Sequence, residues 1–144
     1  MPGLLVIAHA PLASALRAVA EHVYPDCATR LTVLDVPADM PIENVEALAA
    51  GLLASMGTPE ALILTDVFGA TPCNVAQRLA DGVRVKVVTG VNVPMLWRSL
   101  CYASEPLDSL VTRAVAGGTQ NAMQVSSSRP QNQSRSASDV DDKD

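Results

Sequence analysis

The sequence predicts an α/β domain with a doubly wound, mainly parallel four-stranded sheet and helices on both faces. Short apolar runs alternate along the chain with segments whose apolar residues follow helical spacing. Aliphatic residues dominate an apolar fraction of 49%, while aromatic residues make up only 3%, a composition typical of helices packed on parallel strands. The 144 residues suffice for one domain with its own core. Because strands that alternate with helices form parallel sheets with right-handed crossovers, we expect the strand order 2-1-3-4.

The first third of the chain contains two strand signals with a helix between them. Residues 4–8 form a continuous apolar run that is typical of a buried strand. Pro11 can open a helix, because the N–H that proline lacks has no intrahelical partner in the first turn. Apolar residues then follow at helical spacing to Val23, and residues 31–36 alternate between apolar and polar. We expect strand, helix and strand here, followed by a loop over residues 37–41.

The middle of the chain contains the clearest helical stripe. Apolar residues recur at helical spacing between Val45 and Met56, and Gly57 stands where a glycine commonly ends a helix. Residues 61–65 are apolar up to Asp66 and predict the third strand.

The remaining elements are punctuated by two prolines, each of which follows a short loop that contains glycine and suits the first turn of a helix. We expect a helix from Pro72 to about residue 81, a strand over 83–89, a helix over 95–103 after Pro94, and a last helix that begins near residue 107. Gly117 and Gly118 weaken the far end of that last helix.

We expect residues 1–125 to form the domain and residues 126–144 to be a disordered polar tail. The tail contains six Ser and four Asp, and its apolar residues are Ala137 and Val140. A segment of this composition cannot contribute to a core.

Composition and charge exclude several classes of function. The formal net charge is -5, and ten basic residues are scattered among fifteen acidic ones, so a nucleic-acid partner is not expected. Cys27, Cys73 and Cys101 form no CxxC pair, which predicts neither a disulfide framework nor a zinc site. No apolar stretch reaches the roughly 20 residues that span a bilayer. We expect a cytoplasmic protein that needs no metal and no cofactor.

Chemistry-bearing residues follow the strand ends. In open α/β sheets, sites form outside the carboxyl ends of the strands, at the point where the strand order reverses. His9 follows the first strand and Asp66 the third, and the expected order makes those strands neighbours. A carboxylate that accepts a hydrogen bond from one imidazole nitrogen leaves the other nitrogen with a free lone pair. That nitrogen can then act as a nucleophile, a base or a metal ligand.

The loops beside this pair favour the first of these roles. The segments Gly69–Thr71 and Gly90–Asn92 each lead into a helix whose N-terminal N–H groups can bind an anion. Thr71 adds a hydroxyl, which we expect at the N-cap. The sequence contains no G-x-S-x-G, G-x-x-x-x-G-K-[ST] or G-x-G-x-x-G motif. A nucleophilic imidazole that faces an anion site is suited to accept a phosphoryl group.

At these residues the sequence resembles the EIIA domain of the mannose-type sugar phosphotransferase system. The likeness extends from residue 3 to about residue 125 and is carried by VIAH at residues 6–9, DVFGATPCN at 66–74 and GVNVPML at 90–96. The last two motifs are specific in combination. Ala10 and Ala70 depart from the family pattern, which commonly has Gly at both places.

The resemblance implies a phosphoryl carrier that works without a cofactor or metal. His9 would accept phosphate from phospho-HPr, Asp66 would orient it, and Thr71 would contact the phosphate. The loops containing Gly69, Ala70, Gly90 and Asn92 would hold the phosphoryl oxygens. The group would then pass to a EIIB partner or serve in regulation. Relatives form homodimers, and contact with the membrane would be indirect, through a permease.

Three alternatives remain open at this level. A receiver domain with the same sheet order would be phosphorylated on Asp66, but His9 stands where a receiver needs acidic residues. A non-catalytic module could bind an anionic metabolite in the same pocket. The EIIA-like subunit of a dihydroxyacetone kinase would use similar chemistry toward a different acceptor.

Overall fold

The computed structural model describes residues 1–129 of the chain. Its helices and strands alternate as the sequence predicts. In order they are β1 (Gly3–His9), α1 (Leu12–Val23), α2 (Pro25–Ala28), β2 (Leu31–Val36), α3 (Ile42–Ser55), β3 (Ala61–Thr65), α4 (Thr71–Leu79), β4 (Val85–Thr89), α5 (Val93–Cys101) and α6 (Leu107–Gln120).

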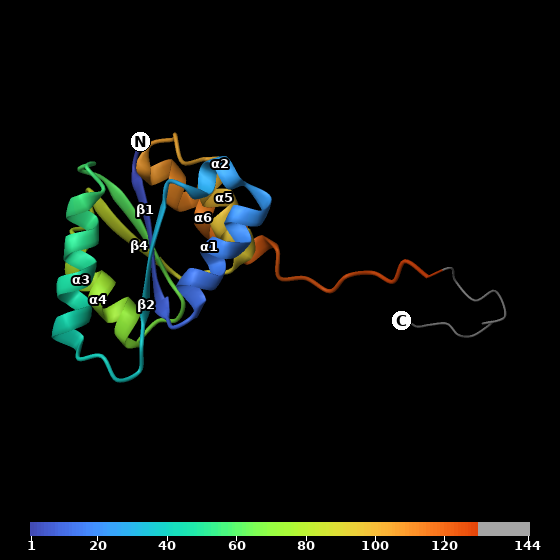
Figure 1. Cartoon of the computed structure of the whole chain (residues 1–144). Coiled ribbons are helices and arrows are strands. Elements are labelled where there is room, and N and C mark those ends of the chain that lie inside the picture. Colours follow the sequence, from blue (N-terminus) through green and yellow to red (C-terminus); the bar gives the residue numbers. More distant parts are fainter. Residues whose placement is uncertain (130–144) are drawn as a thin grey trace.

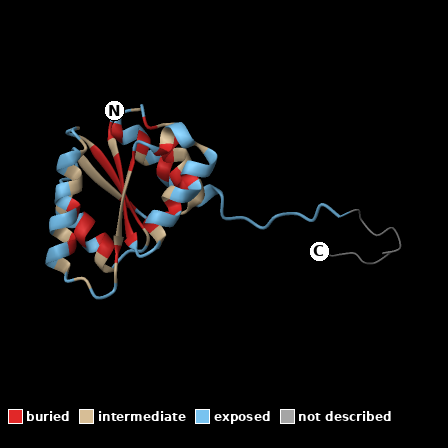
Figure 2. Ribbon diagram, in the orientation of Figure 1, coloured by how far each residue is buried: buried red, intermediate tan, exposed pale blue. Residues whose placement is uncertain are grey.

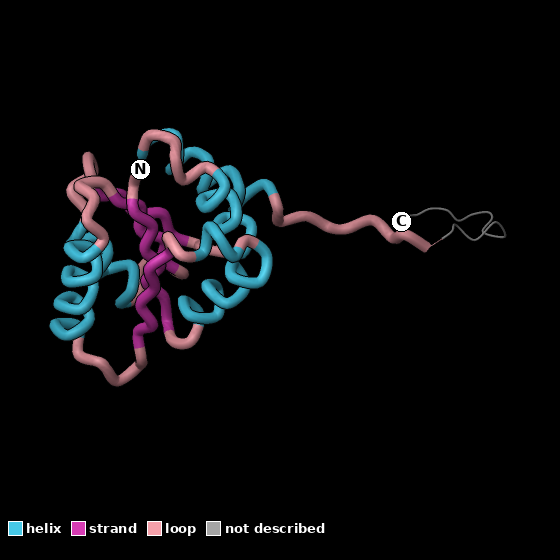
Figure 3. The backbone as a smooth tube through the Cα atoms, turned by 45° about the horizontal axis from the view of Figure 1, so that its top comes forward, coloured by secondary structure: helices cyan, strands magenta, loops and turns pink. Residues whose placement is uncertain are grey.

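The four strands form one parallel sheet in the order β2-β1-β3-β4, which confirms the predicted fold class. Figure 3 shows the strands in the centre of the molecule with helices on both sides. His9 at the end of β1 pairs with Val36 of β2, and Ile7 pairs with Thr65 of β3. Because β1 is central, its carboxyl end lies between the two loops that follow β2 and β3.

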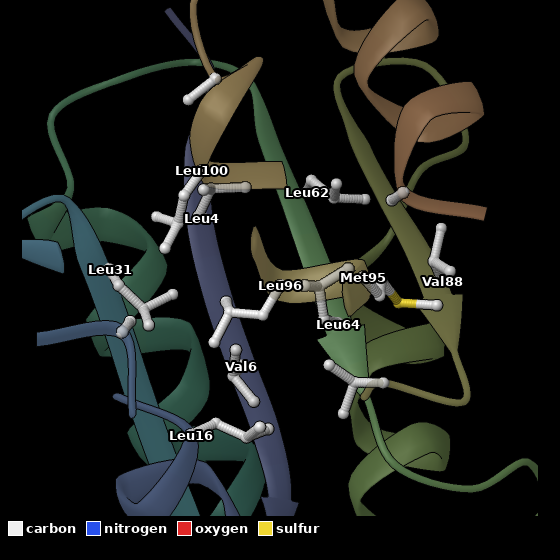
Figure 4. Close-up of a cluster of buried hydrophobic side chains, with 14 of the residues drawn as sticks. Leu4, Val6, Leu16, Leu31, Leu62, Leu64, Val88, Met95, Leu96 and Leu100 are labelled. Carbon is white, nitrogen blue, oxygen red and sulfur yellow. The ribbon is translucent and has the colours of Figure 1, made fainter. Parts of the chain in front are cut away.

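Two apolar cores hold the layers together. Leu4 and Val6 face the core that α1, α5 and α6 cover, whereas Leu5 and Ile7 face the core under α3 and α4. Successive side chains of a strand point to opposite faces, so the continuous apolar run of β1 fills both cores. Figure 2 shows the buried residues concentrated on the sheet and on the inner faces of the helices. Figure 4 shows leucine, valine and methionine side chains filling the first core.

The structure differs from the prediction at the start of the fourth strand and in one additional short helix. The fourth strand begins at Val85 rather than at residue 83, because Asp81 accepts hydrogen bonds from the backbone N–H groups of Val83, Arg84 and Val85 and holds these residues in a turn. The four-residue helix α2 was not anticipated.

The last helix continues through Gly117 and Gly118 to Gln120. Both glycines are buried against α5, and a Cβ at position 117 would lie 2.8 Å from the Cβ of Arg98. These glycines therefore permit close packing of the two helices, which outweighs their low helix propensity.

Beyond α6 the described chain leaves the body of the molecule. Residues 122–129 are exposed and contain no helix or strand (Figure 1). The predicted tail lies outside the described residues from residue 130 onward. Within residues 1–129, no helix combines the length and apolarity needed to cross a bilayer.

Candidate functional site

His9 and Asp66 meet at the carboxyl edge of the sheet. The ring nitrogen Nδ1 of His9 lies 2.7 Å from Oδ2 of Asp66, and the same oxygen accepts a hydrogen bond of 3.0 Å from the backbone N–H of His9. The other oxygen, Oδ1, accepts a 3.0 Å hydrogen bond from the backbone N–H of Val67. The carboxylate therefore fixes both the main chain and the ring of His9. The two residues lie close together because β1 and β3 are neighbours, as the expected strand order predicts.

The environment of Asp66 keeps its carboxyl group ionised. Partial burial by itself would raise the pKa of Asp66, but the hydrogen bonds from the backbone and ring of His9 outweigh burial and lower this pKa below its usual value. The resulting stabilisation of the fold is present above about pH 4 and is lost as the pH falls through the lowered pKa. The ionised carboxylate can only accept a hydrogen bond, so it favours the imidazole tautomer that carries its proton on Nδ1.

This tautomer leaves Nε2 of His9 with its lone pair. Within residues 1–129, Nε2 has no hydrogen-bond partner, and the His9 side chain is 49% exposed against 13% for Asp66. The ring borders a hollow of about 230 Å³ together with Thr71 and with Val36, Pro37, Ala38 and Met40 of the β2–α3 connection. A nucleophilic nitrogen therefore faces a space large enough for a phosphoryl group.

A helix N-terminus lies on the same hollow. Gly69 has a positive φ of 91°, which glycine adopts readily, and the turn there leads directly into α4. Asn74 donates to the carbonyl of Ala70, so the N–H groups of Thr71 and Cys73 precede the first intrahelical bond. Such N–H groups and the helix dipole favour an anion.

Thr71 occupies the first turn of α4 rather than its N-cap, which is Ala70. The prediction was wrong by one residue, because the helix begins before Pro72 and places proline at its second position. Thr71 remains half-buried and borders the hollow beside His9.

The loop after β4 is fixed to the two helices that follow it. Gly90 has a positive φ of 85°. Asn92 is the N-cap of α5, since its Oδ1 accepts from the backbone N–H of Met95 at 2.9 Å. Its Nδ2 donates to the carbonyl of Gly118 in α6 at 3.1 Å. The Asn92 side chain thus joins two helices, and neither residue borders the hollow beside His9.

Two features of this edge were not singled out from the sequence. Phe68 is 72% exposed one position before the Gly69 turn, and Val67 beside it is 50% exposed. The DVFGATPCN motif at residues 66–74 contains the signal for these two side chains, because exposed apolar residues next to a reactive group indicate a contact surface.

The second feature is Asp35 of β2. It accepts hydrogen bonds from the backbone N–H and the hydroxyl of Ser14 and so fixes the first turn of α1.

The edge contains acidic residues without basic ones. The segments 9–16, 35–46, 66–77 and 89–97 contain no Lys or Arg. An anion at His9 would therefore rely on N–H groups of this chain and not on a cation. In the described part of the chain, no group of three or more His, Cys, Asp or Glu side chains is arranged to hold a metal ion.

Comparisons with known proteins identify the family and agree with the fold. A family model described as the PTS system fructose IIA component (EIIA-man) matches residues 3–115, a shorter span than the likeness suggested. The mannose/sorbose specific IIA subunit of the phosphotransferase system from Enterococcus faecalis superposes with a TM-score of 0.81 at 23% identity, over 90% of this chain and 98% of that one.

Two other solved structures superpose on the same fold. A phosphotransferase system component EIIA from Streptococcus agalactiae has a TM-score of 0.77 at 21% identity, over 86% of this chain and 97% of that one. The PTS IIA protein associated with the fucose utilization operon from Streptococcus pneumoniae has a TM-score of 0.65 at 26% identity, over 86% of this chain and 92% of that one. No curated protein sequence matches the chain.

Proposed function

The chain belongs to the EIIA-man family of phosphotransferase system components, and we propose that it carries a phosphoryl group on Nε2 of His9. The observation that carries this proposal is the hydrogen bond of 2.7 Å between Nδ1 of His9 and Oδ2 of Asp66. The opposite ring nitrogen, Nε2, has no hydrogen-bond partner in residues 1–129. This arrangement gives a neutral imidazole a fixed tautomer, a fixed direction and an accessible lone pair.

In the proposed reaction, phospho-HPr donates the group. The Nε2 lone pair of His9 forms a bond to phosphorus while the N–P bond of the donor phosphohistidine breaks, and the donor imidazole keeps that bonding pair. The His9 ring becomes positively charged during transfer, and the ionised Asp66 at Nδ1 stabilises this charge. Because phosphoryl transfer has a loose transition state, position and electrostatics provide most of the catalysis.

The phosphoryl oxygens would then lie in the hollow beside His9. The N–H groups at the start of α4 and the Thr71 hydroxyl are the donors that this chain offers there. No basic residue of the surrounding segments neutralises the group, so it remains reactive toward a second acceptor. We assign that acceptor role to a EIIB component or a regulatory target, and we expect a homodimer in solution.

Intact-mass spectrometry after incubation with phosphoenolpyruvate, enzyme I and HPr tests the proposal. The native chain should gain the mass of one phosphoryl group at neutral to basic pH, and the gain should disappear in acid, because an N–P bond is acid-labile. His9→Ala should remove it. His22→Ala is the matched control, since His22 is the second of the two histidines and is exposed at the end of α1.

Two results would contradict the proposal. One is the absence of a mass gain while HPr itself is phosphorylated. The other is a group that is lost in base rather than in acid, which would identify an acyl phosphate on Asp66 and favour the receiver alternative. Addition of a EIIB component should return the native chain to its original mass.

A further inference from the structure

A second hollow lies along the outward face of α5, separate from the site at His9. Pro94, Trp97, Arg98 and Cys101 border it, at the i, i+3, i+4 and i+7 positions of one helical face. Tyr24, which follows α1, borders it as well. Its volume is about 290 Å³, and none of its lining residues borders the hollow beside His9.

The indole of Trp97 contributes an unused hydrogen-bond donor. Its Nε1 atom is buried and has no partner among the described residues. The ring meets that of Tyr24 edge-to-face, with centroids 6.0 Å apart and planes at 85°, which restrains its orientation. A buried N–H without an acceptor costs free energy, and a ligand atom that accepts a hydrogen bond would remove this cost.

Arg98, the next residue of α5, contributes a positive charge to the lining of the same hollow. Among residues 1–129, the four ion pairs formed do not include its guanidinium. Its side-chain stem packs against Gly117 of α6, where an added Cβ would lie 2.8 Å from the Cβ and 3.2 Å from the Cγ of Arg98. The helix packing therefore limits where the guanidinium can lie.

The lining of the hollow is selective in charge. Among residues 1–129, no Asp or Glu borders it, and its walls include the rings of Trp97, Tyr24 and Tyr102. The Cys101 side chain raises the pKa of Tyr24 above its usual value, so the Tyr24 phenol keeps its proton at neutral pH. Donors and one cation thus line a space with flat apolar walls.

From this arrangement, we propose that the α5 hollow binds a small organic anion with a flat, apolar body. The anionic group would contact Arg98 and accept the Trp97 N–H, while the body lies against the aromatic rings. The volume of about 290 Å³ is near the lower end of ligand sites, which favours a ligand of metabolite size. The proposal does not depend on phosphorylation of His9.

The chain provides its own probe, because Trp97 is the single tryptophan. The indole N–H resonance of the ¹⁵N-labelled full chain should move on titration with phenyl phosphate and should saturate. Phenol, which has the same ring without the charge, should leave the resonance nearly unmoved. The guanidinium would provide charge-assisted hydrogen bonds, which are roughly twice as strong as neutral ones, so Arg98→Gln should weaken binding about tenfold or more. Arg98→Lys should retain part of the affinity.

Several outcomes would overturn the proposal. An unmoved indole resonance would do so, as would equal responses to phenyl phosphate and phenol or equal affinity of the native and Arg98→Gln chains. A fourth is a resonance that shifts with protein concentration alone, together with a doubled mass by light scattering, which would identify the hollow as an interface between two copies. Unchanged thermal unfolding of the Arg98→Gln chain checks that lost binding does not reflect lost folding.

Discussion

Substitution of Asp66 by Asn separates the chemical role of this carboxylate from its structural role. The amide has nearly the same shape but carries no charge, and it can present either an oxygen or an NH₂ group to Nδ1 of His9. In the native chain the same oxygen accepts from the ring at 2.7 Å and from the His9 backbone N–H at 3.0 Å. The substitution therefore weakens both contacts and releases the tautomer that exposes Nε2.

The expected loss in rate exceeds the expected loss in stability. A charge-assisted hydrogen bond contributes about 1.5–3 kcal/mol, and if this is lost in the transition state the transfer rate falls by about 10- to 150-fold. Before transfer the ring carries no phosphoryl group, and the substituted amide can still form a hydrogen bond to it. We therefore expect the free energy of unfolding to fall by only about 1 kcal/mol.

Rapid-quench measurement of phosphoryl transfer from phospho-HPr, together with urea unfolding, distinguishes these effects. Asp35→Asn is the matched control, because Asp35 fixes Ser14 at the start of α1 and does not contact the ring of His9. It should reduce stability and leave the transfer rate within about threefold, less than the tenfold that 1.4 kcal/mol represents. Equal losses of rate and stability in Asp66→Asn would refute the reasoning and return Asp66 to a purely structural role.

Four further substitutions test other parts of the structure. Thr71→Val should slow phosphoryl transfer about tenfold, or about 1.4 kcal/mol, with little change in urea unfolding, because it removes a proposed phosphate donor; an unchanged rate would exclude that contact. Gly117→Ala should lower stability by about 1–3 kcal/mol through overpacking, whereas Gly118→Ala should be near neutral because its added Cβ meets the movable end of the Met95 side chain; equal effects in thermal unfolding would contradict this packing. Three backbone N–H groups lower the pKa of Asp81 to about 2, so its stabilisation is present above about pH 4 and is lost toward pH 2. Asp81→Asn should flatten that part of the stability–pH curve, and an unaltered curve would be evidence against the turn.

The parts of the fold that the sequence predicts well are those set by local pattern. The continuous apolar run of β1 and the alternation over residues 31–36 identify strands, because burial and side-chain direction repeat along the chain. The pairing of His9 with Asp66 is predictable for the same reason, since parallel strands place their carboxyl ends at one edge. The strands need no knowledge of a distant contact, whereas the pairing of His9 with Asp66, 57 positions apart, also needs the strand order that is expected for this fold.

The parts that were missed depend on contacts between distant residues. Gly117 and Gly118 reduce helix propensity locally, and only the close approach of α5 explains why α6 continues through them. The role of Asn92 has the same origin, because its bond to the carbonyl of Gly118 joins residues 26 positions apart. A turn-forming residue and an interhelical tie look identical in the sequence.

The outward direction of Nε2, the nitrogen that we propose to be phosphorylated, also lies beyond sequence pattern, yet the fold determines it. β1 is flanked by β2 and β3, so its end is held from both sides: the N–H of Ala10 donates to the carbonyl of Val36, and that of His9 donates to Asp66. Because this backbone bond uses the same carboxylate oxygen as Nδ1, the ring is turned back toward its own main chain. Nε2 must then face outward. An Asp66 placed one strand further away could reach neither the backbone N–H nor the ring of His9. The imidazole would then populate both tautomers and would have no fixed orientation.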